Sequence, residues 1–524
     1  MARALMIMGT ASDVGKTVIA AGFCRISHRR GIKVAPFKAQ NMSLNSFVTA
    51  EGGEMGRAQV LQAEACGLPP HVDMNPILLK PEADNCSQII VHGKVWGKHD
   101  ARSYFGRRSE LLSFVQDSYQ RLARDHDLIV IEGAGSAAEV NLRDKDIVNW
   151  PVAEMADARV ILVADIDRGG VFAQVIGTLD LLPFTERRRV IGVIINKFRG
   201  DLSLFDDGVK YLEEHTRLPV LGVIPFERKL ELDQEDSVEI GHSQNTFFSS
   251  DTVNIAVVLV PHMSNFTDFN RLAAESDVVL RYVKSPREMS GADVIILPGS
   301  KSTMADLDYL REAGFISAVQ NHASTGSELV GICGGYQMLG REISDPYGIE
   351  SGGKTTGLDF LDVVTELMPE KRTVQVEAQP LLPGTPADCA VRGYEIHVGQ
   401  TQRGQVSACF RIVSRADSDK AELMDDGAIS DDCRTWGTYI HGVFDSPAFR
   451  RYWLNRIRAR KGLSSLPVAV SQNVNQKLSC AIDKWADHLD RHLDISAIFD
   501  GLMVSRQTEI GEQVVRKPQN WYLK

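Results

Sequence analysis

The sequence predicts an α/β protein with two doubly wound parallel-sheet domains and a helical C-terminal extension. Short apolar runs alternate with helix-like stretches up to about residue 228, and a second such series begins at residue 253. This alternation is typical of parallel sheets covered by helices. The chain turns polar between the two series, and it becomes helical and basic after residue 445. We therefore expect domains at 1–228 and 252–445, a linker at 229–251 and a helical extension at 446–524.

The expected strands are short apolar runs that end in polar or glycine-rich segments, as buried parallel strands do. In the first domain they are Ala4–Met8, Leu128–Ile131, Val160–Ala164, Val190–Ile195 and Val220–Ile224. In the second they are Val253–Val260, Val294–Leu297 and Leu329–Ile332. The extension carries no chemical motif, and we interpret it as helical packing or an interface.

The bulk properties narrow the class of protein. A formal net charge of −10 over 524 residues argues against a nucleic-acid partner but allows a local pocket for an anionic small molecule. The eight cysteines are scattered without a C-x-x-C pair, which indicates reduced thiols and a cytoplasmic protein. Apolar runs stay well short of the roughly 18 residues that a membrane span needs, so we expect no membrane partner. A homo-oligomer is possible on these data.

A glycine-rich loop, G-T-A-S-D-V-G-K-T, follows the first strand at residues 9–17 and precedes a helix. That context is typical of a phosphate-binding loop, whose backbone N–H groups surround phosphate oxygens. Lys16 supplies a cation and Thr17 a hydroxyl for Mg²⁺. Thr10 stands where the usual first glycine would be, and this variant resembles dethiobiotin synthetase. We therefore expect Thr10, Gly15, Lys16 and Thr17 to bind ATP.

Two later strand ends support a nucleotide site. Glu132 ends the strand Leu128–Ile131, and its carboxylate can hold Mg²⁺ or a water bound to it. Asn196 follows another buried strand, and its amide can pair with a purine edge. An asparagine after a strand is also a common turn residue, so the two interpretations of Asn196 have about equal weight.

A second site is predicted around Cys333. The segment G-I-C-G-G-Y-Q follows an apolar strand and precedes a helix, so the thiol should lie on a sharp, exposed turn. The N–H of Gly334 can point at the oxyanion of a tetrahedral intermediate, and Gly299, at the end of another strand, can supply a second donor. His441 would take the thiol proton and return it to departing ammonia.

The pattern G-x-C-x-G-x-Q resembles class I glutamine amidotransferases, in which the cysteine forms a glutamyl thioester. The resemblance implies that Gln337 helps to seat glutamine. That class usually carries a glutamate two residues after the histidine, but Val443 stands at this position. A Cys–His dyad or another orienting group is therefore needed, and Glu395 is a candidate, although a solvent-facing glutamate on a strand is an equal alternative.

The two sites together suggest one reaction. A carboxylate is a poor electrophile until phosphorylation by ATP makes its oxygen a leaving group. The nucleophile must be uncharged ammonia, which glutamine hydrolysis can release inside the protein, away from water. We therefore expect an ATP-dependent, glutamine-hydrolysing amide synthase with a passage between its two sites.

Several segments narrow this expectation further. P-F-K-A-Q-N-M-S-L-N-S at residues 36–46 and G-E-M-G-R-A-Q at 53–59 resemble the cobyric acid synthase family. So do V-D-M-N-P-I-L-L-K-P, E-G-A-G-S-A-A-E-V-N-L-R-D-K-D-I, A-D-I-D-R-G-G-V-F-A and S-N-F-T-D-F. The resemblance spans residues 3 to about 445.

This resemblance implies amidation of the b, d, e and g carboxylates of adenosylcobyrinic acid a,c-diamide, a corrinoid, with ATP, Mg²⁺ and glutamine as ammonia donor. Lys38, Gln40, Asn41 and Arg143 are our candidate substrate contacts. We expect Asp146 to position metal or the acceptor carboxylate, and Glu54 to be a further metal ligand.

Two alternatives stay open at this stage. The related cobyrinic acid a,c-diamide synthase has both kinds of site and acts on other carboxylates, although Q-N-M-S-L-N-S favours the first reading. A non-catalytic ATPase switch of the partitioning type also begins with a glycine loop after its first strand. Such a switch usually carries an extra lysine early in the loop, where this chain has Thr10 and Ala11, and it has no use for the Cys333 turn.

Overall fold

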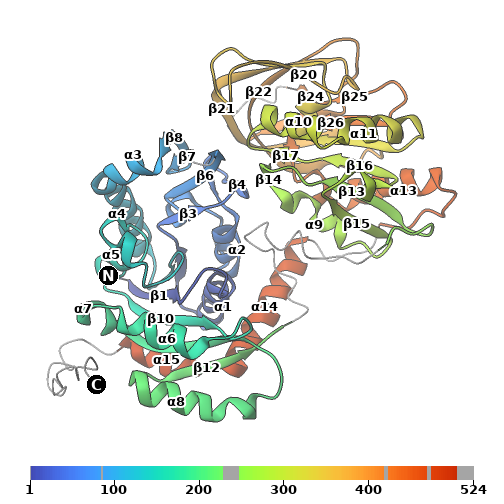
Figure 1. The fold of residues 1–524 in the computed structure, drawn as a ribbon. Helices are drawn as coiled ribbons and strands as arrows, with labels where there is room; N and C mark the ends of the chain where they lie inside the picture. The colour runs from blue at the N-terminus through green and yellow to red at the C-terminus, as the bar shows by residue number, and fades with distance from the viewer. Residues whose placement is uncertain (1, 84–85, 228–246, 418–422, 469–473, 504–524) are drawn as a thin grey trace.

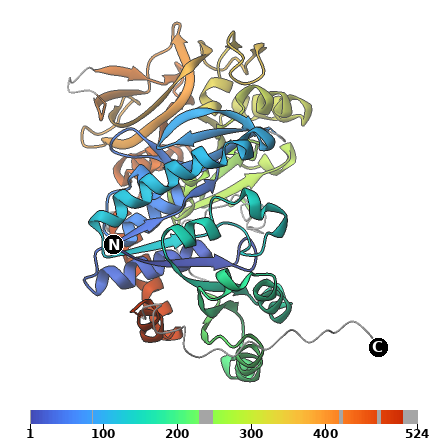
Figure 2. The ribbon, with the colours of Figure 1, turned by 90° about the vertical axis from the view of Figure 1, so that its left-hand side faces the viewer.

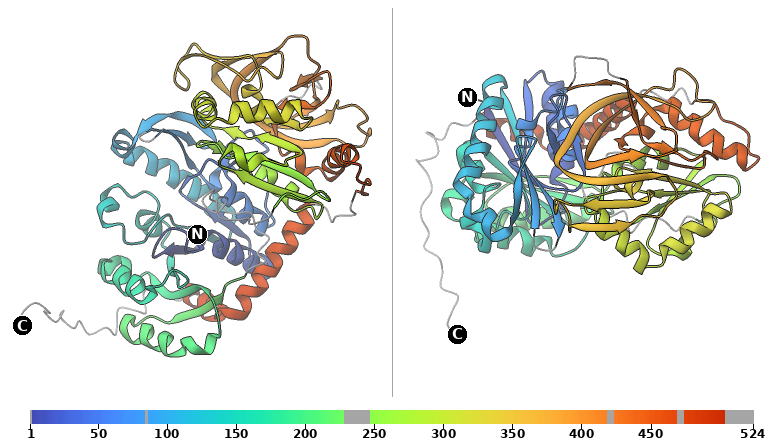
Figure 3. Two further views of the ribbon diagram at one scale, coloured as in Figure 1. Left: turned by 45° about the vertical axis from the view of Figure 1, so that its right-hand side comes forward. Right: turned by 90° about the horizontal axis from the view of Figure 1, so that it is seen from above.

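The computed structural model describes residues 2–83, 86–227, 247–417, 423–468 and 474–503. The predicted linker at 229–251 therefore lies largely outside the described residues. Figure 1 shows two domains, the first in blue to green and the second in yellow to orange. Figure 3 shows them side by side, with the C-terminal helices divided between them.

The first domain is built on a six-stranded sheet of order β12-β11-β10-β1-β9-β2, in which every pair is parallel. Its strands are β1 (Arg3–Gly9), β2 (Val34–Phe37), β9 (Leu128–Glu132), β10 (Arg159–Asp165), β11 (Val190–Phe198) and β12 (Val220–Pro225). Residues 4–9 of β1 are all buried, because helices cover both faces of the sheet. The strands expected in this domain are confirmed.

The helices of the first domain connect these strands. They are α1 (Lys16–Arg29), α2 (Arg57–Ala65), α3 (Ala101–Gly106), α4 (Arg108–Asp125), α5 (Trp150–Met155), α6 (Val171–Asp180), α7 (Phe184–Arg187) and α8 (Asp206–Thr216). Helix α1 begins at the end of the glycine loop, and Gly31, with a φ of 76°, follows it in the left-handed conformation of a helix stop.

The sequence pattern did not predict the domain's second sheet, of order β3-β6-β7-β8. Its strands are β3 (Gln40–Met42), β6 (Ile77–Ala83), β7 (Cys86–Val91) and β8 (Lys94–Asp100), and the hairpin of β4 (Ser46–Val48) and β5 (Glu54–Gly56) lies between β3 and β6 in the chain. Figure 1 shows these strands on the side of the first domain that faces the second. They therefore separate the nucleotide loop from the second domain.

The second domain contains a sheet of order β15-β13-β16-β18-β26-β25, parallel except at β25. Its strands are β13 (Val253–Val258), β15 (Val278–Val283), β16 (Val294–Leu297), β18 (Glu328–Ile332), β25 (Ala428–Ile429) and β26 (Thr435–Thr438), so the expected strands of this domain are confirmed. Its helices are α9 (Asn270–Ala273), α10 (Thr303–Glu312), α11 (Phe315–Ser324) and α12 (Gly334–Met338).

A largely antiparallel sheet covers one side of the second domain. It comprises β19 (Glu342–Asp345), β20 (Gly353–Thr356), β21 (Val363–Pro380), β22 (Val391–Arg403), β23 (Phe410–Arg415), β24 (Met424–Asp426) and β27 (Ile440–His441). A small ladder joins β14 (Met263–Ser264) to β17 (Gly299–Ser300). Because β22 also pairs with β27, this sheet delivers His441 to the carboxyl end of the parallel strands.

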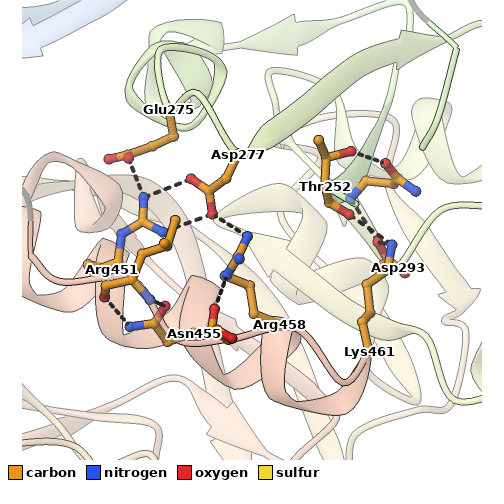
Figure 4. A network of polar contacts seen from close by, with 11 residues as sticks. Thr252, Glu275, Asp277, Asp293, Arg451, Asn455, Arg458 and Lys461 are labelled. Carbon is orange, nitrogen blue, oxygen red and sulfur yellow. Dashed lines mark hydrogen bonds and ion pairs between the residues drawn. The ribbon is translucent and has the colours of Figure 1, made fainter. Parts of the chain in front are cut away.

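The C-terminal helices contact both domains. Helix α13 (Pro447–Arg460) is held on the second domain by ion pairs, with Arg451 and Arg458 both on Asp277, at 2.9 and 3.1 Å (Figure 4). Helices α14 (Val474–His492) and α15 (Ile495–Met503) pack on the first domain, where α14 lies along α1 (Figures 1 and 2). Trp485 donates its indole N–H to the Val18 carbonyl at 2.6 Å. The described helices of the extension therefore pack on different domains.

Candidate active sites

The glycine-rich loop joins β1 to α1 and is braced by side chains from other strands. Gly15 has a φ of 97°, and a Cβ there would collide with the Asn196 amide, so only glycine fits. Asn196 donates to the Val14 carbonyl at 2.8 Å. Lys16 Nζ donates to the carbonyls of Ala11, at 2.9 Å, and Gly135, at 3.0 Å. The Lys16 side chain thus spans the loop, and Asn196 fixes the loop backbone at Val14.

Thr10 lies at the other side of the same loop. Its hydroxyl donates to Gln174 Oε1 at 3.2 Å, and its backbone N–H donates to the Val163 carbonyl at the end of β10. The residue at the unusual loop position is therefore anchored to the sheet. Its direct contact with nucleotide stays a prediction.

Glu132 is the centre of a buried polar cluster beside this loop. Its Oε1 accepts from Thr17 Oγ1 at 2.8 Å and from Lys38 Nζ at 2.9 Å, and its Oε2 accepts from Gln62 at 2.5 Å. The carboxylate is 1% exposed, so the Lys38 ammonium offsets a charge that burial would otherwise penalise. Lys38 binds Glu132, and its expected contact with substrate stays a prediction. The cluster places a hydroxyl and a carboxylate oxygen together.

A large cavity of about 960 Å³ opens next to the loop, at the upper end of the range of roughly 300–1,000 Å³ typical of small-molecule sites. Gly135, whose carbonyl binds Lys16, is part of its wall. Apolar side chains line much of it, and polar ones are interspersed. The lining includes Leu79, Pro81, Ile89, Tyr104 and Trp150, with Gln40, Arg102, Arg143, Lys145 and Asp146.

Cys333 lies on a strained turn between β18 and α12. Its φ of 52° and ψ of −106° fall outside the regions that residues with side chains normally adopt, as at a nucleophile elbow. Gly335 follows, and a Cβ there would collide with the Leu297 carbonyl of β16. The glycines therefore let the turn pack directly on the sheet, which confirms the predicted sharp turn. The expected exposure of the thiol is wrong, because Cys333 is only 6% exposed, at the wall of a small cavity.

His441 and Asp268 form the buried part of the cysteine site. His441 Nδ1 lies 2.7 Å from Asp268 Oδ2, and Asp268 Oδ1 accepts the Gly442 N–H at 3.0 Å. Burial alone would lower the pKa of His441, but the carboxylate of Asp268 and the neighbouring Cys333 outweigh it and raise that pKa to about 10. The histidine is thus poised to receive a proton from the thiol.

Asp268 is the orienting group that sequence reasoning missed, and the suggestion of Glu395 is wrong. Glu395 forms an ion pair with Arg415 at 2.8 Å and lies 3.6 Å from His397, so its carboxylate is paired with these residues and not with His441. Asp268 belongs to the S-N-F-T-D-F segment, whose family likeness was a signal for its importance.

The expected oxyanion and glutamine residues gather around the thiol. β17 brings Gly299 and Ser300 against Gly334, so close that a Cβ on Gly334 would meet the Ser300 N–H and side chain. A small cavity of about 50 Å³ is lined by Cys333, Gly334 and Gln337. Gln337 donates to the Tyr439 hydroxyl at 3.1 Å, while its buried Oε1 has no hydrogen-bond partner within the described ranges. That oxygen can accept a bond from glutamine.

The same cavity reaches the first domain through a buried cluster of charges. Lys80 from β6 and Lys371 from β21 line it, and both bind Glu54, Lys80 at 2.6 Å. The two ammonium groups overcome the effect of burial and hold the pKa of Glu54 well below its usual range. Glu54, expected as a metal ligand with Thr17 and Glu132, is paired with two lysines at the domain interface, and a metal role for it stays a prediction.

Family models match both domains. Residues 5–239 match a CobQ/CobB/MinD/ParA nucleotide binding domain, and residues 254–449 match a CobB/CobQ-like glutamine amidotransferase domain. The cobyric acid synthase of Citrobacter koseri is 49% identical over 97% of this chain and 100% of its own. This chain belongs to the cobyric acid synthase family. The enzymes of Syntrophobacter fumaroxidans, 47% identical, and Klebsiella pneumoniae, 49% identical, each match over 95% of this chain and 98% of their own.

The full-length likeness to cobyric acid synthases decides between the alternatives. The nucleotide-binding model is shared by CobQ, CobB, MinD and ParA proteins, so it does not separate the alternatives. Three relatives that each cover at least 95% of this chain do. Each of them matches through both domains and not through the nucleotide-binding half alone.

Within the cobyric acid synthase family segment at 36–46, the predicted substrate residues have different surroundings. Gln40 lines the large cavity and accepts a hydrogen bond from the Tyr104 hydroxyl. Asn41 donates to Gln59 at 3.3 Å, on the side of the Glu132 cluster. Of these two residues, Gln40 is therefore the one placed to touch a ligand in the cavity, while Asn41 lies on the nucleotide side.

Arg143 and Asp146 also line the large cavity, but both have structural partners. Arg143 Nη1 donates to both carboxylate oxygens of Glu186, at 2.8 and 2.7 Å. The carboxylate of Asp146 accepts backbone N–H groups from Val148, Asn149 and Trp150 at 2.8–3.0 Å. These contacts account for Asp146 as the residue that shapes the loop before α5. A direct catalytic role for it stays a prediction.

Two further findings bear on the expected setting of the protein. In the described ranges, the chain has no helix long and apolar enough to cross a membrane. All eight cysteines are free thiols.

Proposed function

We propose that this protein amidates the b, d, e and g carboxylates of adenosylcobyrinic acid a,c-diamide, using ATP and glutamine. One observation carries the proposal. Strand β6 lies between the two cavities, with Leu79 and Pro81 in the wall of the large one and Lys80 in the wall of the Cys333 one. Because successive side chains of a strand point to opposite faces, a single sheet separates carboxylate activation from ammonia release.

The large cavity is the proposed corrinoid site. Its volume and mostly apolar wall suit a macrocycle, and Gln40, Arg102 and Lys145 offer polar contacts to peripheral carboxylates. Gly135 joins this wall to Lys16, so a carboxylate in the cavity can approach the terminal phosphate of a nucleotide on the loop. Attack of the carboxylate oxygen on that phosphorus releases ADP and leaves an acyl phosphate, which is electrophilic at carbon.

Mg²⁺ fits the residues beside the loop. Thr17 and Glu132 present hydroxyl and carboxylate oxygens 2.8 Å apart, and Mg²⁺ is usually held by one or two carboxylates plus phosphate oxygens. Thr17 and Glu132 would hold the ion, which would supply charge neutralisation for the nucleotide phosphates. Lys38 and Gln62 would keep the Glu132 carboxylate oriented toward that position.

The second domain is proposed to release ammonia from glutamine. The Cys333 thiol gives its proton to His441 Nε2, and the thiolate attacks the side-chain amide carbon of glutamine. The Gly334 N–H faces the resulting oxyanion. His441 returns the proton to the departing nitrogen, ammonia leaves, and water hydrolyses the glutamyl thioester to glutamate. Asp268 holds the imidazole in position throughout.

The cluster of Lys80, Glu54 and Lys371 is proposed as the start of the ammonia route. Burial lowers the pKa of Lys371 to about 8, more than the attraction of Glu54 raises it. Positive charge around the cavity disfavours ammonium and so keeps the nitrogen in its reactive, neutral form. From this cluster ammonia must pass an edge of the β3-β6-β7-β8 sheet to reach the acyl phosphate.

The free thiols are in keeping with a cytoplasmic enzyme.

The test is direct. The purified protein is incubated with the diamide, Mg·ATP and glutamine, and the product mass is followed as each carboxylate becomes an amide. Cys333→Ala should abolish synthesis with glutamine and retain it with added ammonium. An unchanged product mass with the wild-type protein would contradict the proposal. So would a Cys333→Ala protein that makes no amide with either glutamine or ammonium.

A further inference from the structure

The first domain contacts the surroundings of His441 through two consecutive residues, Asn45 and Ser46. The Ser46 N–H donates to Asn265 Oδ1 at 3.0 Å, and its carbonyl accepts the Tyr394 hydroxyl at 3.2 Å. Asn45 Oδ1 accepts the Thr267 hydroxyl at 3.1 Å. All three partners belong to the second domain, and all of the bonds are buried. A short piece of the first domain therefore binds three residues around the glutaminase base.

Two of these partners touch the imidazole itself. The Tyr394 ring stacks on His441, with ring centres 5.3 Å apart and planes 17° apart. Asn265 has a φ of 53°, and its Nδ2 lies 3.3 Å from His441 Nε2. Because the Ser46 N–H requires the amide oxygen of Asn265, the amide nitrogen must face the histidine.

That orientation has a chemical consequence for the base. Nδ1 of His441 faces the Asp268 carboxylate and carries the proton there, so Nε2 holds the lone pair that must receive the Cys333 proton. An N–H of Asn265 directed at this lone pair competes with the thiol for it. Protonation of Nε2 would also place its N–H opposite the N–H of Asn265, and two donors cannot bond to each other. Asn265 thus opposes the proton transfer that Asp268 favours.

The same segment reaches the large cavity a few residues earlier in the chain. Gln40 and Met42, on β3, are part of its wall, and β3 leads directly into Asn45 and Ser46. A ligand that displaces β3 by contact with these side chains would therefore shift the Ser46 N–H. Such a ligand shifts the equilibrium between the two positions of β3 by as much as its affinity for the protein differs between them.

We propose that the segment Gln40–Ser46 makes glutamine hydrolysis depend on occupancy of the large cavity, with Asn265 as the positioning residue through which it acts on His441. The inference rests on the proposed function and adds its regulation. With the cavity empty, Ser46 holds Asn265 against Nε2 and hydrolysis is slow. Acceptor binding releases the amide, Nε2 takes the thiol proton, and ammonia forms only when it can be used.

The test compares glutamate release with and without the diamide and Mg·ATP, in the wild-type protein, Asn265→Ala and Asn265→Asp. Both variants remove the N–H that faces Nε2, and the aspartate retains an oxygen for Ser46. We expect the acceptor to stimulate the wild-type protein on the order of tenfold, within the usual range of allosteric coupling. Both variants should hydrolyse glutamine at the stimulated rate without acceptor.

Thr267→Val is the matched control, because it removes the bond to Asn45 and leaves Asn265 in place. Its stimulation ratio should stay closer to that of the wild-type protein than to that of either Asn265 variant. Unstimulated hydrolysis in both Asn265 variants at or below the wild-type rate, with the stimulation ratio preserved, would overturn the inference. The unstimulated rates need no corrinoid, so this result is distinct from a failure of the proposed function, which product mass reports.

Discussion

The carboxylate of Asp268 lies 2.7 Å from Nδ1 of His441, although 173 residues separate them in the chain. This contact explains how the site works with Val443 at the position where related amidotransferases carry glutamate. It also raises the pKa of His441 and so favours transfer of the Cys333 proton to the imidazole.

Replacing Asp268 by asparagine should remove that stabilisation. A raised pKa means that Asp268 stabilises the protonated form of His441. This stabilisation is complete at low pH and is lost as pH rises through the pKa of about 10. In Asp268→Asn this loss should begin at lower pH. We expect glutaminase kcat/KM to fall on the order of 10²- to 10⁴-fold. A pH profile of glutamate release should show the alkaline limb displaced toward neutrality, and an unmoved limb would argue against this role for Asp268.

Lys38→Met should disable the first site alone. It leaves Glu132 buried without its ammonium partner, which typically costs about 3–5 kcal/mol for a buried pair. We expect loss of amide synthesis with glutamine and with ammonium alike, while unstimulated glutaminase activity persists. The double variant Lys38→Met/Glu132→Gln removes the uncompensated charge, so it should recover stability in denaturant unfolding without recovering synthesis. Recovery of synthesis as well would show that Glu132 is not needed for activation.

Lys80→Met should loosen the connection between the two sites. It removes one of the two cations on Glu54 in the wall of the Cys333 cavity, so ammonia should escape or become protonated. The measurement is glutamate released per amide formed, which should exceed parity in the variant. Lys98→Met is the control, because Lys98 also pairs with a glutamate of β6, at 2.8 Å, but lies outside that cavity wall. If the two variants release the same amount of glutamate per amide, the cluster of Lys80, Glu54 and Lys371 is not part of the ammonia route.

The C-terminal extension should contribute to the stability of the first domain. Leu489 of α14 is fully buried against Gly22 of α1. Leu489→Ala should lower the free energy of unfolding by about 2–5 kcal/mol, as large-to-small core substitutions do. Leu181→Ala, at an exposed position, should change it by less than about 0.5 kcal/mol. Denaturant unfolding compares them, and a Leu489→Ala protein as stable as Leu181→Ala would contradict the packing role of α14.

The parallel strands and both glycine turns could be predicted because their information is local. Runs such as Leu128–Ile131 are apolar throughout since both sheet faces are covered, and the Cys333 turn needs glycine at close approaches. Asp268 could not be found in this way, because its partner is brought to it only by β22 and β27. The surroundings of Glu54 could not be predicted for a related reason, because only the folded chain brings Lys371 to it.

Nitrogen released at Cys333 should reach the activated carboxylate without entering bulk solvent. Amide-¹⁵N glutamine, supplied with the diamide, Mg·ATP and an excess of unlabelled ammonium, tests it most directly through the product mass. We predict that each new amide carries ¹⁵N despite the excess. Amides that carry mostly unlabelled nitrogen, from a protein that hydrolyses glutamine normally, would contradict the account.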